Sequence, residues 1–193
     1  QTGQMYNNLY ALTHMVALGD VVEDLLQANQ EIILSVNHSN KLVFLDANDF
    51  HTKAEIYPLN SPRYILQVSA DKAYVSSLYY PNIYVIDLHT HSLIKTLHTD
   101  YPNTEHMAYL DGWVYVCNWD TASSLLYRIN PLTDAMESIP LGVKASHDIV
   151  LDQLHRLWIL SGNTYAGITS HLTLFDPASL QIVRQWTFDS HMD

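Results

Sequence analysis

Short apolar runs, each closed by an Asp or Asn and a polar turn, recur at nearly regular intervals along the chain. The closing residues are Asp46, Asp87, Asn130 and Asp176, which are 41, 43 and 46 residues apart. The runs are short and rich in β-branched and aromatic residues, which is typical of strands. Because no stretch keeps a helical period, the pattern predicts a repeated β unit rather than a helical solenoid.

Each repeat contains four such segments. First strands are expected at 21–27, 63–69, 105–111 and 147–153, and second strands at 31–37, 72–78, 113–119 and 156–162. Third strands end at the four Asp or Asn residues, and fourth strands are expected at 53–59, 92–98, 136–142 and 181–188. Four short strands in a period of about 42 residues are the signature of a β-propeller blade. The sequence therefore predicts an all-β propeller with four-stranded antiparallel blades at about 20–61, 62–103, 104–145 and 146–190.

Two details of the repeat predict local structure. The Asp or Asn that closes each third strand is expected to cap its own turn through the side chain, as in an Asx-turn. Large apolar residues share one position in the second strands, and these are Ile33, Tyr74, Tyr115 and Trp158. We expect these four side chains to be buried between neighbouring blades, with Trp158 among the most important for stability.

Residues 9–19 have the pattern of a fourth strand that leads into the first blade. Because the last repeat has its own fourth strand at 181–188, this segment is expected to belong to a preceding blade. The chain 1–193 would then be part of a single larger ring of six to eight blades. A closed ring of four blades is the alternative.

The composition limits the partners. The chain has 193 residues, 48% of them apolar, which is typical of a folded domain. Twenty acidic residues against nine basic ones give a net charge of −11, so neither nucleic acid nor an anionic membrane surface is an expected partner. No apolar run is long enough to span a membrane. The single cysteine, Cys117, lies in an apolar strand and is expected to be a buried apolar residue.

The segments KAYVSSLYYPNIYVIDLHTHSL (72–93) and LNSPRYI (59–65) resemble the YVTN-type repeat of YncE-like propellers. Within that family the chain is most similar to surface lipoprotein propellers of the cell envelope. This resemblance implies a bacterial envelope location and binding of a nutrient such as cobalamin or an iron siderophore. It also implies a TonB-dependent outer-membrane transporter as partner. The N-terminal lipid-anchoring Cys of those lipoproteins is not found in this chain.

Candidate binding residues gather where first strands begin and where second strands lead into third strands, because these segments share one face of a propeller. The loops between second and third strands are longer in the last two repeats, which favours a binding role for that face. Neutral loop growth, channel-capping polar residues and aromatic residues that only cover the blades are the alternatives. The expected ligand-binding residues are Arg63, Tyr64, Tyr79, Tyr80, Glu105, His106, Asn118, Trp119, His147, Asp148 and Tyr165.

Metal and enzyme signatures are weak. His89 and His91 have ligand-like spacing, but they fall in a turn at the opposite edge, so they are expected to be solvated. The acidic segment 20–24 is better explained as a solvated loop than as a calcium site. Neither a metal nor a cofactor is expected, and the sequence lacks a nucleophile elbow, an HExxH motif and a phosphate-binding glycine loop.

We therefore expect a non-enzymatic propeller that captures a small nutrient ligand. Two other classes remain open: an enzyme of quinoprotein or lyase type, whose catalytic residues would be scattered, and a scaffold for protein–protein contacts. A convergent pocket with perturbed acid–base groups would favour the enzyme.

Overall fold

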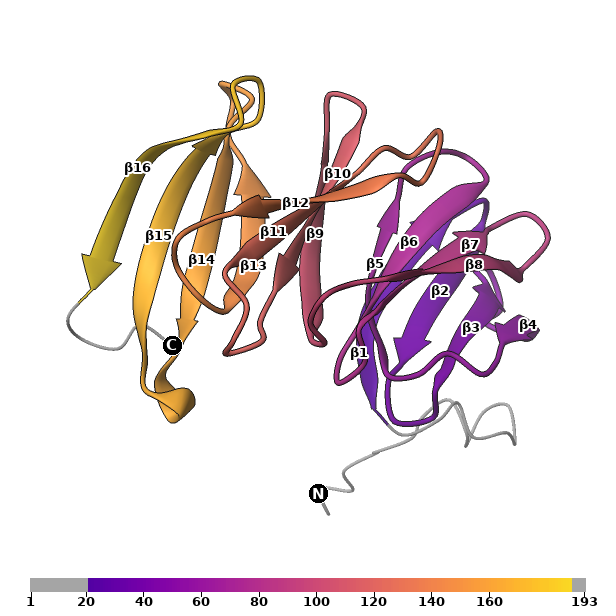
Figure 1. Ribbon diagram of the computed structural model, residues 1–193. Helices are drawn as coiled ribbons and strands as arrows, with labels where there is room; N and C mark the ends of the chain where they lie inside the picture. Colours follow the sequence, from indigo (N-terminus) through magenta and orange to yellow (C-terminus); the bar gives the residue numbers. More distant parts are fainter. Residues whose placement is uncertain (1–20, 189–193) are drawn as a thin grey trace, which may run out of the picture.

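The computed structural model contains four antiparallel sheets of four strands, one for each repeat. It describes residues 21–188, and this part of the chain contains no α-helix, only a 3₁₀ turn at Thr164–Ala166 (η1). Figure 1 shows the sheets in a row as successive blades. The predicted all-β propeller fold is confirmed. The strand expected at 9–19 lies outside the described residues, and the number of blades in the whole ring stays a prediction.

In each blade the strands follow one another in chain order, from the innermost to the outermost. The first blade contains β1 (Val22–Ala28), β2 (Glu31–Val36), β3 (Lys41–Asp46) and β4 (Thr52–Ile56). The second contains β5 (Pro62–Gln67), β6 (Lys72–Ser77), β7 (Asn82–Asp87) and β8 (Ser92–His98). The third contains β9 (Thr104–Leu110), β10 (Trp113–Asn118), β11 (Leu125–Ile129) and β12 (Met136–Pro140). The fourth contains β13 (Ser146–Leu151), β14 (Leu157–Asn163), β15 (Ile168–Asp176) and β16 (Gln181–Phe188).

The turn between the third and fourth strands has the same structure in every blade. Its Asp or Asn Oδ1 accepts a hydrogen bond of 2.8–3.0 Å from the backbone N–H two residues further on. This is the predicted Asx-turn. Four residues after the Asp or Asn, each turn holds a residue with φ between 50° and 61°, and these residues are Phe50, His91, Asp134 and Leu180. We call them the turn residues.

Three of the turn residues contact the preceding blade. His91 Nε2 lies 3.0 Å from Glu31 Oε2, and its ring packs 4.5 Å from that of Phe44. The expectation of a solvated His91 is therefore wrong, because the positive φ carries the side chain back onto the first blade. Leu180 packs into the apolar cluster between the third and fourth blades. Phe50 is 47% exposed.

The turn residue of the third blade, Asp134, contacts two lysines and a tyrosine of the second blade. Its carboxylate accepts hydrogen bonds from Lys72 Nζ at 2.6 Å and from the Tyr74 hydroxyl, and pairs with Lys95 Nζ at 2.9 Å. Burial opposes ionisation of Asp134, but these three donors outweigh it and lower the pKa of the carboxyl. The ion pairs therefore link the second and third blades.

Apolar clusters fill the spaces between the blades. Ile33 packs against the second blade, Tyr74 against the third and Tyr115 against the fourth, and all three are buried as predicted. Trp158 has the same position in the fourth blade, but it is only partly buried and stacks on Trp186 of β16, with ring centroids 5.6 Å apart. Trp158 therefore packs within its own blade, and we expect its replacement to cost less stability than that of Tyr74.

The ion pairs of Glu31 give the fold a pH dependence. Burial raises the pKa of Glu31, but hydrogen bonds from Lys53 and His91 outweigh burial and hold it below 4.5. A depressed pKa contributes stability that is present above the unfolded-state value and lost as the pH falls through the folded-state value. Glu31→Gln should therefore lower the free energy of unfolding by about 1–2 kcal/mol at pH 7.

This difference between wild type and Glu31→Gln should shrink as the pH falls below 4.5. Urea unfolding between pH 7 and pH 3.5 measures it. Glu55→Gln, which removes the carboxylate of an exposed pair with Lys41, is the control and should change stability by less than about 0.5 kcal/mol. A Glu31→Gln effect that does not vary with pH would contradict the assignment.

Candidate functional site

The innermost strand of every blade carries a β-bulge at the same height. The pairing register shifts between Val22 and Asp24 on β1, between Pro62 and Ile65 on β5, and between Ser146 and Asp148 on β13. On β9, Glu105 and His106 lie between the paired Thr104 and Met107 and face the single residue Cys117 of β10. A bulge re-aims side chains and is common next to binding sites. The residues at or beside the four bulges are Glu23, Asp24, Arg63, Tyr64, Glu105, His106, His147 and Asp148, which we call the inner rim.

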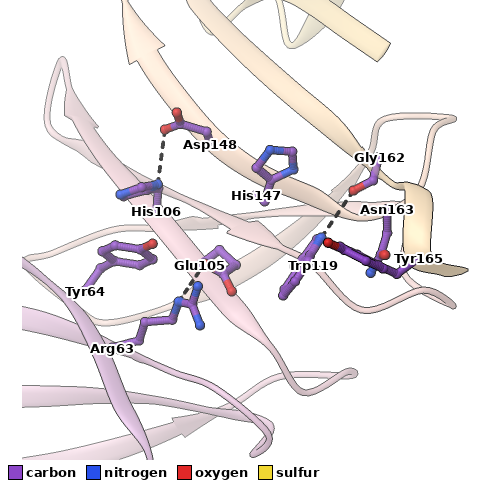
Figure 2. A pocket seen from close by; sticks show the side chains of 10 residues that line it. All are labelled: Arg63, Tyr64, Glu105, His106, Trp119, His147, Asp148, Gly162, Asn163 and Tyr165. Atoms are coloured by element: carbon purple, nitrogen blue, oxygen red, sulfur yellow. Dashed lines mark hydrogen bonds and ion pairs between the residues drawn. The ribbon is translucent and has the colours of Figure 1, made fainter. Parts of the chain in front are cut away.

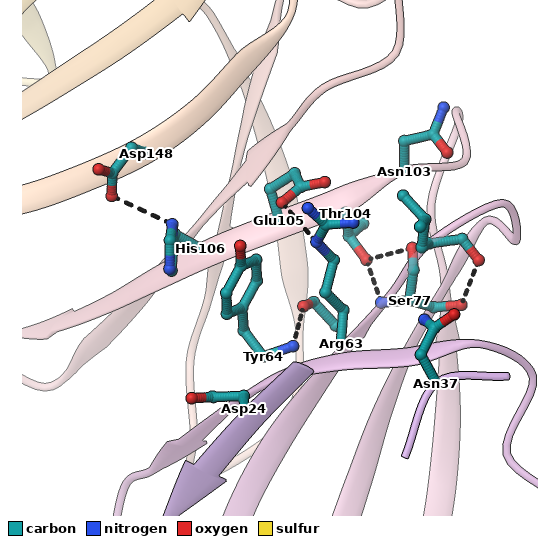
Figure 3. Close-up of polar contacts among 12 residues, drawn as sticks. Asp24, Asn37, Arg63, Tyr64, Ser77, Asn103, Thr104, Glu105, His106 and Asp148 are labelled. Atoms are coloured by element: carbon teal, nitrogen blue, oxygen red, sulfur yellow. Dashed lines mark hydrogen bonds and ion pairs between the residues drawn. The ribbon is translucent and has the colours of Figure 1, made fainter. Parts of the chain in front are cut away.

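Hydroxyl groups of neighbouring strands (Figure 3) and the carboxylate of Asp24 hold the bulged backbone in place. The backbone N–H of Tyr64 donates to Ser76 Oγ at 3.0 Å, and that of Ile65 donates to Asp24 Oδ2 at 2.7 Å. Between the second and third blades, Thr104 Oγ1 accepts the N–H of Ser77 at 2.7 Å. Because these partners satisfy N–H groups that the bulges remove from the ladder, the rim has a fixed backbone.

Neighbouring blades pair across the inner rim (Figure 2). Arg63 Nε lies 2.9 Å from Glu105 Oε2, which joins β5 to β9. His106 Nδ1 lies 3.1 Å from Asp148 Oδ1, which joins β9 to β13. The ring of Tyr64 stacks on that of His106, with centroids 3.6 Å apart. The pairs fix the ionisable groups of three blades relative to one another.

A cavity of about 320 Å³ opens between these side chains and the loops above the third and fourth blades, a volume near the lower end for ligand pockets. Trp119 forms one wall, where its Nε1–H donates to the carbonyl oxygen of Gly162 at 3.2 Å. Tyr165 lies at the mouth and is almost fully exposed. The lining residues are Arg63, Tyr64, Glu105, His106, Trp119, His147, Asp148, Gly162, Asn163 and Tyr165.

The carboxyl of Glu105 in this cavity has a strongly shifted pKa. Its side chain is 2% exposed, and burial raises its pKa to about 8, although Arg63 acts in the opposite direction. Among the described residues, Glu105 Oε1 has no hydrogen-bond partner. A buried carboxyl oxygen without a donor is unusual in a folded protein and is a common feature of binding sites.

The structure brings eight of the eleven predicted site residues to this cavity. Tyr79 and Tyr80 are not among its lining residues, because the tight turn between β6 and β7 holds them as exposed side chains. Asn118 is fully buried, and its amide donates to the carbonyl oxygens of Tyr101 and Pro102 at 3.3 and 2.7 Å. It therefore supports a loop rather than facing a ligand.

Sequence reasoning missed two lining residues, Gly162 and Asn163. Both lie at the end of β14, where the register of the β14–β15 pair shifts between Ser161 and Asn163. A glycine at the start of the longest loop was the available signal, since an isolated Gly in a strand often marks a bulge or a close approach.

Three further observations concern the cysteine, possible metal ligands and membrane-spanning helices. Cys117 is buried as expected, and burial raises the pKa of its thiol, which leaves it a poor nucleophile. Within residues 21–188 no group of three or more His, Cys, Asp or Glu side chains is placed to hold a metal ion. The same residues include no helix of the length and apolarity that crossing a membrane requires.

Comparison with known proteins supports the fold. No family model and no curated protein matches the chain. Among solved structures, hydrazine synthase of Kuenenia stuttgartiensis matches 85% of the chain with a TM-score of 0.76 and 13% identity. The dihydro-heme d1 dehydrogenase NirN in complex with DHE matches 89% with a TM-score of 0.70 and 14% identity. The extracellular domain of BT4673 from B. thetaiotaomicron matches 89% with the same TM-score and identity.

The chain spans 48%, 39% and 25% of the lengths of these three structures. The neighbours are β-propeller proteins. At such low identity the likeness concerns architecture alone, so the chain is similar in fold to β-propeller proteins with widely different activities.

Proposed function

We propose that this chain belongs to a non-enzymatic propeller of the bacterial cell envelope that captures a small nutrient ligand at the inner rim. The observation that carries the proposal is the cavity of about 320 Å³, where aromatic side chains and ionisable groups from three blades converge. An apolar wall with a few fixed polar groups is the usual composition of a small-molecule site. Ligand capture needs no more than this.

The envelope location and the nutrient class come from two sources. The YVTN-type segments resemble surface propellers that bind cobalamin or siderophores. The structural neighbours include an extracellular domain and BamB from Moraxella catarrhalis, which matches 84% of the chain with a TM-score of 0.58 and 12% identity. A corrinoid or metal chelate is larger than the cavity, so one edge of it would enter between Trp119 and the rim. Transfer to an outer-membrane transporter is the step that such capture would serve.

Calorimetric titration with cyanocobalamin, a ferric siderophore and haem tests the proposal. We expect heat of binding with one of them, and Trp119→Ala should weaken that binding at least ~10-fold because a flat aromatic wall is lost. Tyr79→Ala is the matched control, since Tyr79 is an exposed aromatic residue that does not line the cavity, and it should leave the affinity within about twofold. Absence of heat with all three ligands would contradict nutrient capture.

An acid–base enzyme is the second candidate. The cavity holds the His106–Asp148 pair and a carboxyl with a raised pKa, an arrangement that general acid–base catalysis uses. Two of the structural neighbours, hydrazine synthase and the dihydro-heme d1 dehydrogenase, are enzymes. Mass spectrometry of a ligand recovered after incubation separates the two functions. An unchanged ligand supports capture, and a converted ligand that stays unchanged with His106→Ala supports the enzyme.

A further inference from the structure

The charges of the inner rim are unequal. Four acidic side chains, those of Glu23, Asp24, Glu105 and Asp148, lie at or beside the bulges of the inner strands, against one guanidinium, that of Arg63. Arg63 is already paired with Glu105 at 2.9 Å. Asp24 and Asp148 are not balanced by any Lys or Arg in the ion pairs of the described residues. The rim therefore has an excess of negative charge.

Glu105 provides an observation independent of that count. Glu105 lines the cavity, and its Oε1 atom is buried. Among the described residues, no donor lies within hydrogen-bond distance of this oxygen. The other oxygen, Oε2, faces Arg63. A carboxyl oxygen accepts hydrogen bonds, so the group that would complete this site is a donor. Positively charged N–H donors form the stronger bonds with carboxylates.

The aromatic residues of the cavity favour the same kind of ligand. Trp119 and Tyr64 line its walls, and Tyr165 lies at its mouth. Indole and phenol faces attract cations through their negative quadrupole, and Trp does so best. In addition, the net charge of −11 raises the local concentration of cations at the surface and disfavours anions.

We infer that the inner rim binds an organic cation, with a protonated amine or amidine that donates to Glu105 and lies near Asp148, and with a flat or apolar part against Trp119. The inference rests on the proposed function, because it names the ligand class of the same cavity. It restricts that function, since a ligand whose only charged groups are carboxylates or phosphates would meet the acidic rim with like charge.

Three probes with one ring system test the ligand class: tryptamine, which is cationic, tryptophol, which is neutral, and indole-3-propionate, which is anionic. Titration of the 193-residue chain, followed by NMR or calorimetry at pH 7, gives the three dissociation constants. We expect tryptamine to bind at least ~10-fold more tightly than the other two probes and to weaken with added salt. Equal affinities, or a preference for the anion, would overturn the inference and leave the cavity as a binding site.

Variants locate the interaction. Glu105→Gln and Asp148→Asn should each reduce the preference for tryptamine over tryptophol at least ~3-fold. Asp148→Asn removes a carboxylate of the rim, and Glu105→Gln removes a carboxyl group that a bound cation would favour in its ionised form. Glu137→Gln is the control, since this exposed carboxylate pairs with Arg128 outside the cavity lining, and it should leave the preference unchanged. A preference that survives both rim substitutions would overturn the assigned position. Failure of every indole probe and every nutrient ligand would contradict the proposed function itself.

Discussion

Tyr74→Ala should lower the free energy of unfolding by about 3–5 kcal/mol, the largest effect expected for any single side chain of this protein. Tyr74 is fully buried in the apolar cluster between the second and third blades, together with Val114 and Tyr127. Truncation would leave a cavity between two blades whose backbones are fixed by their own hydrogen-bond ladders. It would also take away the hydroxyl that donates to Asp134.

Urea denaturation measures this effect, and Tyr74→Phe separates its two parts. The Phe variant keeps the ring and loses only the hydroxyl, so it should cost about 1–2 kcal/mol, since Lys72 and Lys95 still neutralise Asp134. Trp158→Ala should cost less than Tyr74→Ala, because Trp158 is partly exposed. A Tyr74→Ala variant within 1 kcal/mol of wild type would mean that the blades do not depend on this contact.

Strand positions were predictable because the residues that determine them repeat. The Asp or Asn caps a turn of its own blade, and the large apolar residue of the second strand recurs at the same place in each repeat, so the pattern of a single repeat predicts both. Observed strand ends differ from the expected ones by a few residues.

Contacts between blades were harder to predict. His91 has a positive φ, and its side chain contacts Glu31 of the first blade. The turn sequence does not predict this contact, because the four turn residues are of four different types: Phe, His, Asp and Leu. Their backbone conformation is the same, but His91, Asp134 and Leu180 each make a different contact with the preceding blade. A turn histidine was therefore expected in solvent, although its ring contacts Glu31 and Phe44 of the first blade.

In the candidate site, too, the positions of residues could be predicted from the repeat, but their contacts with other strands could not. The first-strand residues Arg63, Glu105 and Asp148 were placed correctly at one rim because equivalent strand positions meet around a propeller axis. The bulges that aim them, however, depend on partners from other strands, such as Asp24 for the N–H of Ile65. Tyr79 and Tyr80 have the residue type that binding surfaces favour, but their turn is too short to reach the cavity.

Gly162→Ala should damage both the fold and the cavity. Gly162 has a φ of +142°, a conformation that other residues rarely adopt, and a Cβ at this position would lie 2.9 Å from the backbone Cα of Ser170. The strained dihedral and the close approach together predict a loss of about 2–4 kcal/mol in the free energy of unfolding. Because the N–H of Gly162 donates to Ala145 and its carbonyl accepts from Trp119, any relief of the clash would move both partners.

Gly167→Ala is the matched control for this prediction. Gly167 lies in the connection that follows β14 and has a φ of +70°, but a Cβ there would meet no atom within 4 Å. It should therefore cost only the dihedral strain, about 1–2 kcal/mol, and leave the Trp119 wall in place. Denaturation gives the two stabilities, and the emission of Trp119, measured against a Trp119→Phe background, reports on the wall. Equal losses in the two variants, with the same emission, would show that β15 yields to the added methyl group and that the cavity does not depend on a glycine at position 162.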